Sequence, residues 1–430
     1  MTLWVSNLAL TDYRSYREAL VEFPAGVVVL QGANGRGKTN LVEAIAYLST
    51  FSSHRSHSSK NLVRIPKGKE TQPGGAVVRT RANTEGRSHL LELEIARGRA
   101  NRARLNRSKV SPRDILGIIR VVVFAPEDLE LLRGGPEGRR TFVDEVVLKL
   151  KPHHLSVLQE FGKVSRQRAA HLKEMGGRYR HRPPDPYDDF GSGGAAAASM
   201  TDIWDEQLAF LSATIMVHRL AVIEAMHPLV QDSYNALTGA DRKAEIEYVS
   251  DLGNVPDLGD FRVVAGRFEG DPAPAIDEAR RLYLEQMIER REQEKARGIN
   301  LSGSHRDDIL VSLDGLPVRG FASHGEIWSS ALMLRLSEME LLRLDGDYPV
   351  LVLDDVFAEL DESRREGLLA CIDPVEQVFV TVAVENDLPE GIEASVFDVV
   401  RDQDGWSLII PVSPSQTASE ANIQKEVEEG

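Results

Sequence analysis

The residues from Gly32 to Thr39 have the spacing of a loop that binds phosphate groups. They read GANGRGKT, which fits the GxxxxGK[ST] pattern at every fixed position. In such a loop backbone N–H groups surround the phosphates, the lysine reaches the β and γ phosphates, and the last hydroxyl holds Mg²⁺. We therefore predict a site for ATP and Mg²⁺ in which Lys38 contacts phosphate and Thr39 contacts the metal. The predicted nucleotide-binding residues of this loop are Gly32, Ala33, Asn34, Gly35, Arg36, Gly37, Lys38, Thr39 and Asn40.

A predicted strand and a predicted helix place this loop. Runs of β-forming residues predict strands over residues 3–10 and 21–30, and the second of these leads into the loop. After Thr39, apolar side chains recur at helical spacing, at Leu41, Ala44, Ile45 and Leu48. The phosphates would then face the N-terminus of a helix, where N–H groups lack partners within the helix.

A second apolar run, at residues 349–353, ends in two carboxylates, Asp354 and Asp355. A strand that ends in Asp supplies the hard oxygen ligand that a phosphate loop needs for Mg²⁺. We therefore predict that Asp354 binds the metal together with Thr39, and that Asp355 polarises the attacking water. Because Thr39 and Asp354 lie near opposite ends of the chain, the sequence predicts an ATPase head that is split by a large insertion.

The predicted fold class is α/β: an ABC-type P-loop ATPase head, with mixed sheets and helices, split by a mainly helical second domain. Apolar residues at spacings of three and four predict that most of residues 145–300 is helical. We assign the two lobes of the head to residues 1–144 and 301–412. The stretch 176–199, rich in Gly, Pro and charge, is predicted to be a disordered loop, and residues 413–430 a disordered tail.

Ser323 and Gly325 stand between the predicted helical domain and the acidic strand, just before a helical pattern. ABC ATPases carry a Ser-x-Gly element at this place, and it contacts the γ-phosphate of a nucleotide bound to the other subunit. A hydroxyl and the amides of a helix N-terminus are suitable donors to phosphate. We therefore predict that Ser323 and Gly325 complete the nucleotide site of a second copy, with two nucleotides held between two heads.

Composition limits the environment of the protein. The chain has 430 residues and one cysteine, Cys371, so it has no internal disulfide framework and fits a reducing compartment. Its N-terminus lacks the basic start and apolar block of a signal peptide, and no uninterrupted apolar run approaches a bilayer-spanning length. We expect a soluble, cytoplasmic protein with no membrane partner.

Two runs of basic residues contrast with the net charge of −15. The first, from Arg97 to Lys109, contains no acidic residue, and the second, from Lys163 to Arg182, contains only Glu174. Such runs are commonly solvated faces or flexible loops, and the alternative is a surface for a partner that carries phosphates. The runs alone do not decide between these two interpretations.

Several longer segments are similar to those of one family. Residues 126–144, which read PEDLELLRGGPEGRRTFVD, and residues 353–361, which read LDDVFAELD, resemble the RecF family of recombination-repair ATPases related to SMC proteins. The segments 10–16 (LTDYRSY) and 303–308 (GSHRDD) look like further elements of this family. The resemblance covers nearly the whole chain, from about residue 2 to about residue 400.

This resemblance implies an ATP-dependent DNA-binding protein of recombinational repair. It would form a homodimer on ATP, bind gapped DNA or single-strand/double-strand junctions without sequence preference, and assist RecA loading together with RecR and RecO. Its ATP hydrolysis would be weak, stimulated by DNA, and would drive release. The resemblance also implies that four arginines of the first basic run contact DNA phosphates in a salt-sensitive way: Arg99, Arg102, Arg104 and Arg107.

One departure and two alternatives accompany the resemblance. Residues 323–326 read SHGE where the family usually has Ser-Gln-Gly-Gln, and an anionic Glu326 near a triphosphate is unfavourable unless it points away. The nucleotide-binding subunit of an ABC transporter would share the phosphate loop, the Ser-x-Gly element and the acidic strand, but not a large helical insertion that splits the head. An SMC-like structural tether would bind ATP without hydrolysing it.

Overall fold

The computed structural model describes residues 3–56, 58–68, 70–84, 86–181, 193–239, 242–343, 348–383 and 393–412, without the side chains of 176–181 and 193–199. The chain forms two compact units. The first, here called the head unit, consists of Met1–Leu129, Ser233–Ala240 and Trp328–Gly430. The second, here called the arm unit, consists of Glu130–Asp232 and Asp241–Ile327.

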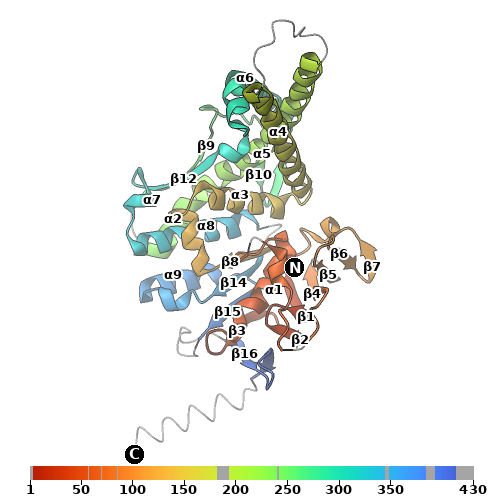
Figure 1. The fold of residues 1–430 in the computed structure, drawn as a ribbon. Helices are drawn as coiled ribbons and strands as arrows, with labels where there is room; N and C mark the ends of the chain where they lie inside the picture. The colour runs from red at the N-terminus through yellow and green to blue at the C-terminus, as the bar shows by residue number, and fades with distance from the viewer. Residues whose placement is uncertain are drawn as a thin grey trace, which may run out of the picture. The chain divides into compact units, whose positions relative to one another are not determined.

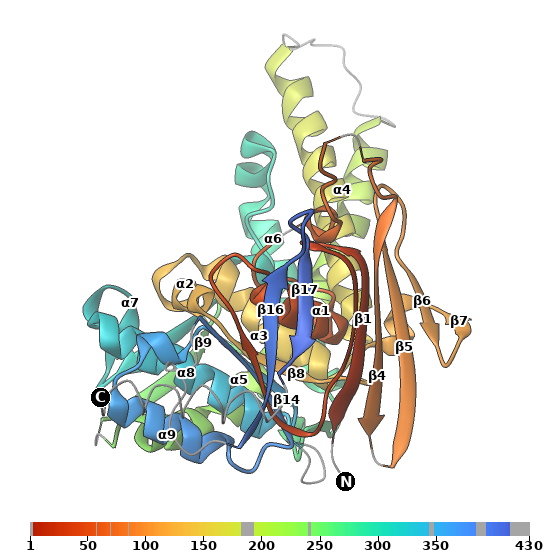
Figure 2. The ribbon, with the colours of Figure 1, turned by 90° about the horizontal axis from the view of Figure 1, so that it is seen from below.

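Two six-stranded sheets dominate the described part of the head unit (Figures 1 and 2). The antiparallel sheet has the order β2 (Tyr16–Glu22), β1 (Trp4–Tyr13), β4 (Gly75–Thr84), β5 (Arg87–Ala96), β6 (Arg102–Leu105) and β7 (Ser108–Val110). The other has the order β17 (Ser407–Pro411), β16 (Ala394–Arg401), β3 (Gly26–Gln31), β15 (Gln377–Val382), β14 (Val350–Asp354) and β8 (Val121–Phe124). In this second sheet only the pairing of β17 with β16 is antiparallel.

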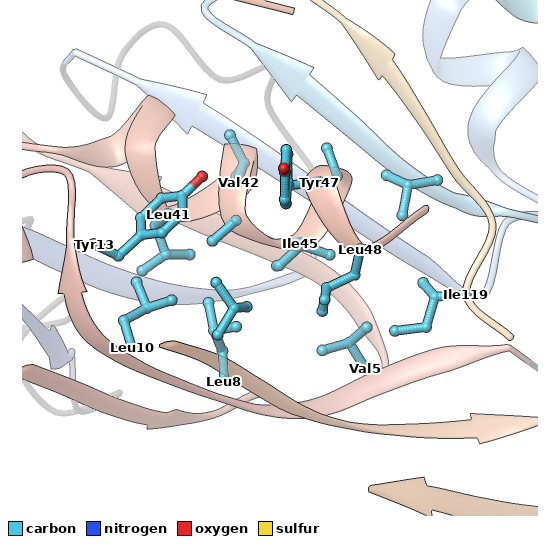
Figure 3. Packing of buried hydrophobic residues seen from close by; sticks show 14 of the residues in the cluster. Val5, Leu8, Leu10, Tyr13, Leu41, Val42, Ile45, Tyr47, Leu48 and Ile119 are labelled. Atoms are coloured by element: carbon cyan, nitrogen blue, oxygen red, sulfur yellow. The ribbon is translucent and has the colours of Figure 1, made fainter. Parts of the chain in front are cut away.

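Helix α1 (Lys38–Thr50) packs between these sheets and forms the centre of the head core. Figure 3 shows side chains of β1, among them Leu8, Leu10 and Tyr13, directed toward Leu41 and Ile45 of α1. All five side chains are at most 1% exposed. Burying each leucine or isoleucine contributes about 1.5–3 kcal/mol. The start of α1, which follows the phosphate loop, is therefore fixed by packing along the rest of the helix.

Short helical segments and one longer helix complete the described head unit. They are η1 (Ser59–Leu62), η2 (Pro112–Ile115), η3 (Pro126–Asp128), η5 (Phe357–Glu359) and α9 (Glu362–Ile372). Asp361 caps α9, since its carboxylate accepts a hydrogen bond from the backbone N–H of Arg364 at 3.0 Å. Helix α8 (His324–Leu341) begins in the arm unit and continues into the head unit.

The arm unit is mainly helical, with two small sheets. Its helical segments are α2 (Leu129–Arg133), α3 (Pro136–Leu150), α4 (His154–His181), α5 (Gly193–Thr238), α6 (Ala273–Arg297), η4 (Ser304–Arg306) and α7 (Val318–Phe321). Its strands are β9 (Ala244–Val249), β12 (Asp308–Leu313) and β13 (Leu316–Pro317) in one sheet, and β10 (Arg262–Val264) with β11 (Arg267–Glu269) in the other. Residues Met200–Thr238 of α5 are long and apolar enough to cross a bilayer by composition alone, but 78% of their most apolar window is buried inside the protein, as in a core helix.

The secondary structure differs from the sequence-based expectation at two places. The predicted strand 21–30 is two strands in different sheets, because Pro24, which has no N–H to donate, separates β2 from β3. The predicted loop 176–199 is helical as far as His181 and again from Gly193, where alanines at 195–198 favour a helix. Residues 182–192 and the predicted tail 413–430 lie outside the described residues.

The limits of the compact units also differ from the predicted domain limits after residues 144 and 300. Residues 130–144 and 301–327 belong to the arm unit. Arg139 of α3 forms an ion pair with Asp308 at 2.7 Å, and β12 pairs with β9 along its length. These contacts hold both segments within the arm unit.

Candidate nucleotide site in the head unit

The phosphate loop follows β3, which lies between two parallel neighbours, β15 and β16. Gly32 and Gly37 adopt φ values of 144° and 120°, which side chains rarely tolerate. A Cβ on Gly32 would overlap the carbonyl oxygen of Val399, and a Cβ on Gly37 would overlap the hydroxyls of Ser15 and Ser407. Both glycines are therefore required by the conformation and by the close approach of neighbouring segments.

Lys38 is the first residue of α1 and is 4% exposed. Its Nζ donates a hydrogen bond to the carbonyl oxygen of Gly32 at 2.6 Å, so the ammonium lies across the two ends of the loop. A buried ammonium needs polar partners. Phosphate oxygens would be further acceptors for the same group, as predicted for Lys38.

The structure brings the two distant halves of the predicted metal site together. Thr39 Oγ1 donates to Asp354 Oδ1 at 3.0 Å, and Thr381 Oγ1 donates to the same oxygen at 2.6 Å. Asp354 ends β14, and Thr381 lies beside it in the parallel register of β15. A hydroxyl and a carboxylate this close are able to ligate one Mg²⁺ ion, which prefers oxygen ligands.

Asp354 is 3% exposed, and its neighbours act on the charge of its carboxyl in opposite directions. Burial raises the pKa of its carboxyl, and the adjacent Asp355 raises it further. Hydrogen bonds from Thr381 and Thr39 oppose this effect by favouring the ionised form. A divalent cation would favour the ionised form much more strongly, so we expect metal binding to release a proton when Asp354 is protonated.

Asp355 has a left-handed backbone conformation, with φ of 52°. Its backbone N–H donates to Thr381 Oγ1 at 2.9 Å, so Thr381 links the two acidic residues. The conformation turns the chain sharply after β14 and places consecutive carboxylates at the end of one strand. Strained backbone of this kind is common at functional sites, which fits the predicted role of Asp355 in polarising water.

Asn40 connects the start of α1 to two neighbouring segments. Its Nδ2 donates to Ser15 Oγ at 2.8 Å, and its Oδ1 accepts from Arg55 Nη1 at 3.0 Å. Arg55 also lies 3.8 Å from a carboxylate oxygen of Glu127, in η3. The side chain of Asn40 thus holds neighbouring loops around the first turn of α1.

Ser323 and Gly325 stand at the N-terminus of α8, as predicted for the Ser-x-Gly element. Ser323 Oγ accepts from the backbone N–H of Glu326 at 3.4 Å, while a Glu326 carboxylate oxygen accepts from the N–H of Ser323 at 2.7 Å. This reciprocal pair is a capping box. Glu326 also forms an ion pair with Arg242, and the hydrogen bonds from Ser323 lower the pKa of its carboxyl. The negative charge of Glu326 is therefore compensated within the arm unit. This compensation reduces the repulsion between Glu326 and a triphosphate that the sequence predicts.

The first basic run lies at one edge of the antiparallel sheet, in the turn after β5 and in β6 and β7, and acidic residues of β5 pair with three of its arginines. Arg104 lies 3.0 Å from a carboxylate oxygen of Glu92, and Arg99 lies 2.5 Å from one of Glu94. Arg102 is 3.8 Å from Glu94 and 65% exposed. Arg107 lies in the turn between β6 and β7, with φ of 72°. The run has no acidic residue in sequence, but cross-strand pairing supplies opposite charges.

The second basic run contains a buried structural residue, Arg168, which is 0% exposed. Its guanidinium contacts Asp205 and Glu294 at 2.6 Å each and Asn300 at 2.8 Å. Arg168 therefore joins α4, α5 and the end of α6 and is not part of a surface for phosphates.

The sequence analysis missed three residues that contact the phosphate loop. Tyr16, Arg401 and Ser407 donate hydrogen bonds to carbonyl oxygens of Gly37, Gly35 and Arg36, respectively. Tyr16 lies in a segment that resembled the family but had no assigned role. Nothing in the sequence around Arg401 and Ser407 marks them, because their role depends on the pairing of β16 with β3.

Comparison with known proteins assigns the family. The family model described as the RecF/RecN/SMC N terminal domain matches residues 4–407. The DNA replication and repair protein RecF of Beutenbergia cavernae is 44% identical over 93% of this chain and 98% of its own length. The chain belongs to the RecF family. RecF of Frankia alni is also similar, with 42% identity over 90% of this chain and 94% of its own length.

Solved structures support the same fold. A structure of the recombination mediator protein RecF–ATPrS in the RecFOR pathway has a TM-score of 0.77 at 24% identity, covering 96% of this chain and 99% of its own. The Smc head domain of Pyrococcus furiosus has a TM-score of 0.51 at 14% identity, covering 99% of this chain and 100% of its own. This RecF-family chain therefore has the α/β fold of an ABC-type ATPase head with a helical region. The relatives' names place it among DNA replication and repair proteins.

Proposed function

We propose that this RecF-family chain is an ATP-dependent DNA-binding protein that dimerises on ATP and acts in recombinational repair. In the proposal, the dimer binds gapped DNA or single-strand/double-strand junctions in the cytoplasm. Together with RecO and RecR it assists the loading of RecA. Slow, DNA-stimulated ATP hydrolysis then drives release.

The observation that carries the proposal is the convergence of the Thr39 and Thr381 hydroxyls on the same oxygen of Asp354, which joins α1, β15 and β14. In the proposed mechanism, Lys38 and the loop amides bind the phosphates, while Thr39 and Asp354 hold Mg²⁺. The metal, when bound, supplies charge neutralisation at the β and γ phosphates. Asp355 orients the attacking water.

A role for ATP in dimerisation is supported by the exposure of Ser323 at the start of α8. Ser323 and Gly325 belong to the arm unit, whereas the phosphate loop belongs to the head unit. The capped start of α8 exposes Ser323, and a hydroxyl at a helix N-terminus is a suitable donor to the γ-phosphate of a second copy. ATP would then be shared between two chains, and its hydrolysis would separate them.

Analytical ultracentrifugation with and without ATP, on and off gapped DNA, tests this proposal. We expect a monomer without nucleotide, a dimer with ATP and Mg²⁺, and a DNA-bound dimer on gapped duplexes. Lys38→Ala should prevent dimerisation because it removes the phosphate-binding ammonium. Ser323→Arg should prevent dimerisation while ATP binding to the monomer persists.

Leu20→Arg is the matched control for the added charge, because Leu20 is 76% exposed on β2, far in sequence from Ser323. We expect this variant to dimerise normally. A Ser323→Arg protein that still dimerises with ATP would remove Ser323 from the shared site. A wild-type protein that binds ATP but stays monomeric on gapped DNA would overturn the proposed dimer switch.

A further inference from the structure

Four carbonyl oxygens of the phosphate loop accept hydrogen bonds from side chains. Lys38 Nζ donates to Gly32 O at 2.6 Å, and Tyr16 Oη donates to Gly37 O at 3.1 Å. The other two donors come from the far end of the sequence. Arg401 Nη2 donates to Gly35 O at 2.6 Å, and Ser407 Oγ donates to Arg36 O.

These contacts control the direction of the loop amides. In a planar trans peptide, the C=O of one residue and the N–H of the next point in opposite directions. Holding Arg36 O against Ser407 therefore turns the N–H of Gly37 away from β17. Holding Gly37 O against Tyr16 turns the N–H of Lys38 away in the same manner. Amides presented by such a loop are the groups that cradle phosphates.

The hairpin formed by β16 and β17 is itself anchored beside the loop, near β1 and α1 (Figure 2). The N–H of Ser407 donates to Ser15 O at 2.9 Å, in the turn between β1 and β2. Trp406, 4% exposed, packs beneath two cations, with Arg64 at 4.4 Å and Lys67 at 4.0 Å from its ring centre. Lys67 also donates to Asp404 O at 2.9 Å.

The hairpin packs directly against the backbone of the loop. Val399 O would lie less than 3.0 Å from a Cβ atom on Gly32, and Ser407 Oγ would lie less than 3.0 Å from a Cβ atom on Gly37. The same two glycines that open the loop to phosphates therefore also admit the hairpin. Arg401 supports the turn in addition, since its Nη1 donates to Gly405 O at 3.2 Å.

We propose that Arg401 and Ser407 are positioning residues that hold the phosphate loop in its anion-binding conformation through the carbonyls of Gly35 and Arg36. This inference rests on the proposed binding of ATP by the loop. It assigns a role to the hairpin of β16 and β17. Arg401 is 366 residues from Gly35 in sequence, and Ser407 is 371 residues from Arg36. Neither residue touches nucleotide in this proposal.

Equilibrium binding of fluorescent ATP and ADP analogues to the full chain tests the role of Arg401. Arg401→Ala should raise the dissociation constants of both nucleotides about tenfold, since a charge-assisted hydrogen bond that orders the loop is lost. Arg401→Lys should restore part of the affinity, because a single ammonium keeps one donor and the charge. The ratio of ATP to ADP affinity should stay unchanged, because the loop amides contact the phosphates that both nucleotides carry. Lys38→Ala, by contrast, should weaken ATP more than ADP.

Ser407→Ala tests the second contact, with Ile410→Ala as its matched control on the same strand. Ile410 is 47% exposed, and residues an odd number apart on a strand point to opposite faces. We expect Ser407→Ala to lose most of the ATP-induced increase in melting temperature while its nucleotide-free melting temperature stays close to that of the wild type. Ile410→Ala should keep the full ATP-induced increase.

The outcomes separate this inference from the proposed function. If the wild-type chain binds neither nucleotide, the proposed ATP site fails. If the wild-type chain binds ATP and the Arg401 and Ser407 variants bind it equally well, the site stands and the positioning role is wrong. A variant that loses nucleotide-free stability but keeps its ATP-induced shift also contradicts the positioning role, because its contact would then be purely structural.

Discussion

Asp354 shows how burial changes the protonation of a single carboxylate. Its side chain is 3% exposed and accepts hydrogen bonds from Thr39 and Thr381. Burial, followed by repulsion from Asp355, raises the pKa of this carboxyl. Without a cation, the folded protein therefore keeps the Asp354 proton to a higher pH than the unfolded chain does. The corresponding stability is fully present below the ordinary aspartate range and is lost as pH rises through the raised pKa.

Replacement of Asp354 by asparagine should stabilise the metal-free protein at neutral pH and abolish its response to ATP and Mg²⁺. An asparagine oxygen can still accept the two hydroxyl hydrogen bonds, but it carries no buried charge. Thermal unfolding in EDTA from pH 4.5 to pH 8 should show a melting temperature a few degrees above wild type at the upper end and a smaller difference at the lower end. A difference that does not change with pH would show that Asp354 does not titrate as described.

Replacement of Asp355 by asparagine should slow ATP turnover about 10²–10⁴-fold, the usual contribution of a positioned acid or base. Asparagine tolerates the left-handed conformation at φ of 52°, so the fold should be retained. The measurement is single-turnover hydrolysis combined with sedimentation, in which the ATP-bound dimer on DNA should persist. Asp355→Ala would be a poorer variant, because alanine at this backbone conformation adds about 1–2 kcal/mol of strain. Normal turnover in Asp355→Asn would place the water-orienting group elsewhere.

At the scale of the elements, charged side chains at the start of α8 and on strands β4, β5 and β6 are paired with side chains of opposite charge. Glu326 completes a capping box with Ser323 and forms an ion pair with Arg242. On the sheet, Glu92 and Glu94 of β5 oppose the arginines of neighbouring strands. Both groups are partly exposed, and exposed pairs of this kind contribute about 0–1 kcal/mol each. These pairs therefore contribute little to the free energy of unfolding.

Replacement of Glu326 by glutamine should change the ATPase rate less than about threefold. The glutamine carbonyl can accept the same hydrogen bond from Ser323, so the capping box persists, and only the pair with Arg242 is lost. Steady-state hydrolysis on gapped DNA measures this effect. A large gain in rate would instead mean that the negative charge of Glu326 repels the nucleotide of the second copy.

Replacement of both Glu92 and Glu94 by glutamine should strengthen DNA binding if this face of the sheet contacts DNA. The change frees Arg99, Arg102 and Arg104 from their acidic neighbours and should make the salt dependence of binding steeper. Replacing Arg99, Arg102, Arg104 and Arg107 by alanine should have the opposite effect on both quantities. Fluorescence anisotropy of gapped DNA between about 50 and 200 mM salt measures both variants. Unchanged affinity and slope in both would remove this face from the DNA interface.

At the scale of the whole molecule, each compact unit has its own core and its own buried polar network. The head core is built from both sheets and α1, and the arm core from helices α4, α5 and α6 with their neighbours. In the arm unit, Arg168 joins three segments through Asp205, Glu294 and Asn300. The phosphate loop, Thr39 and Asp354 lie within the head unit, so they can be perturbed separately from the Arg168 network.

Replacement of Arg168 by methionine should destabilise the arm unit by about 3–5 kcal/mol, because two buried carboxylates lose their shared partner. The affinity of the monomer for ATP should not change, since the phosphate loop, Thr39 and Asp354 all belong to the head unit. Denaturant unfolding and nucleotide binding measure the two effects. Lys163→Ala is the control within the same basic run, because Lys163 is 58% exposed and pairs with an exposed glutamate, Glu160. A loss of DNA binding without a loss of stability in Arg168→Met would contradict its structural role.

The elements around the candidate nucleotide site were largely predictable from sequence because local chemistry dictates them. A strand, a glycine-rich turn and a helix are consecutive in the chain, and an apolar strand ends in Asp354, the predicted metal ligand. The predicted strand 21–30 and the loop 176–199 were less accurate. Local propensity does not report where pairing breaks at Pro24 or how far α4 and α5 extend.

What the sequence determined by itself was the chemistry: the phosphate loop, the acidic strand, the Ser-x-Gly element and the family. The tertiary structure decided which residues meet. Sheet order places Thr381 beside Asp354 and brings Arg401 and Ser407 to the loop, and helix packing buries Arg168 while cross-strand pairing opposes Arg104 with Glu92. The physical reason is that burial and charge pairing depend on contacts between segments far apart in the chain, which no local pattern of residues encodes.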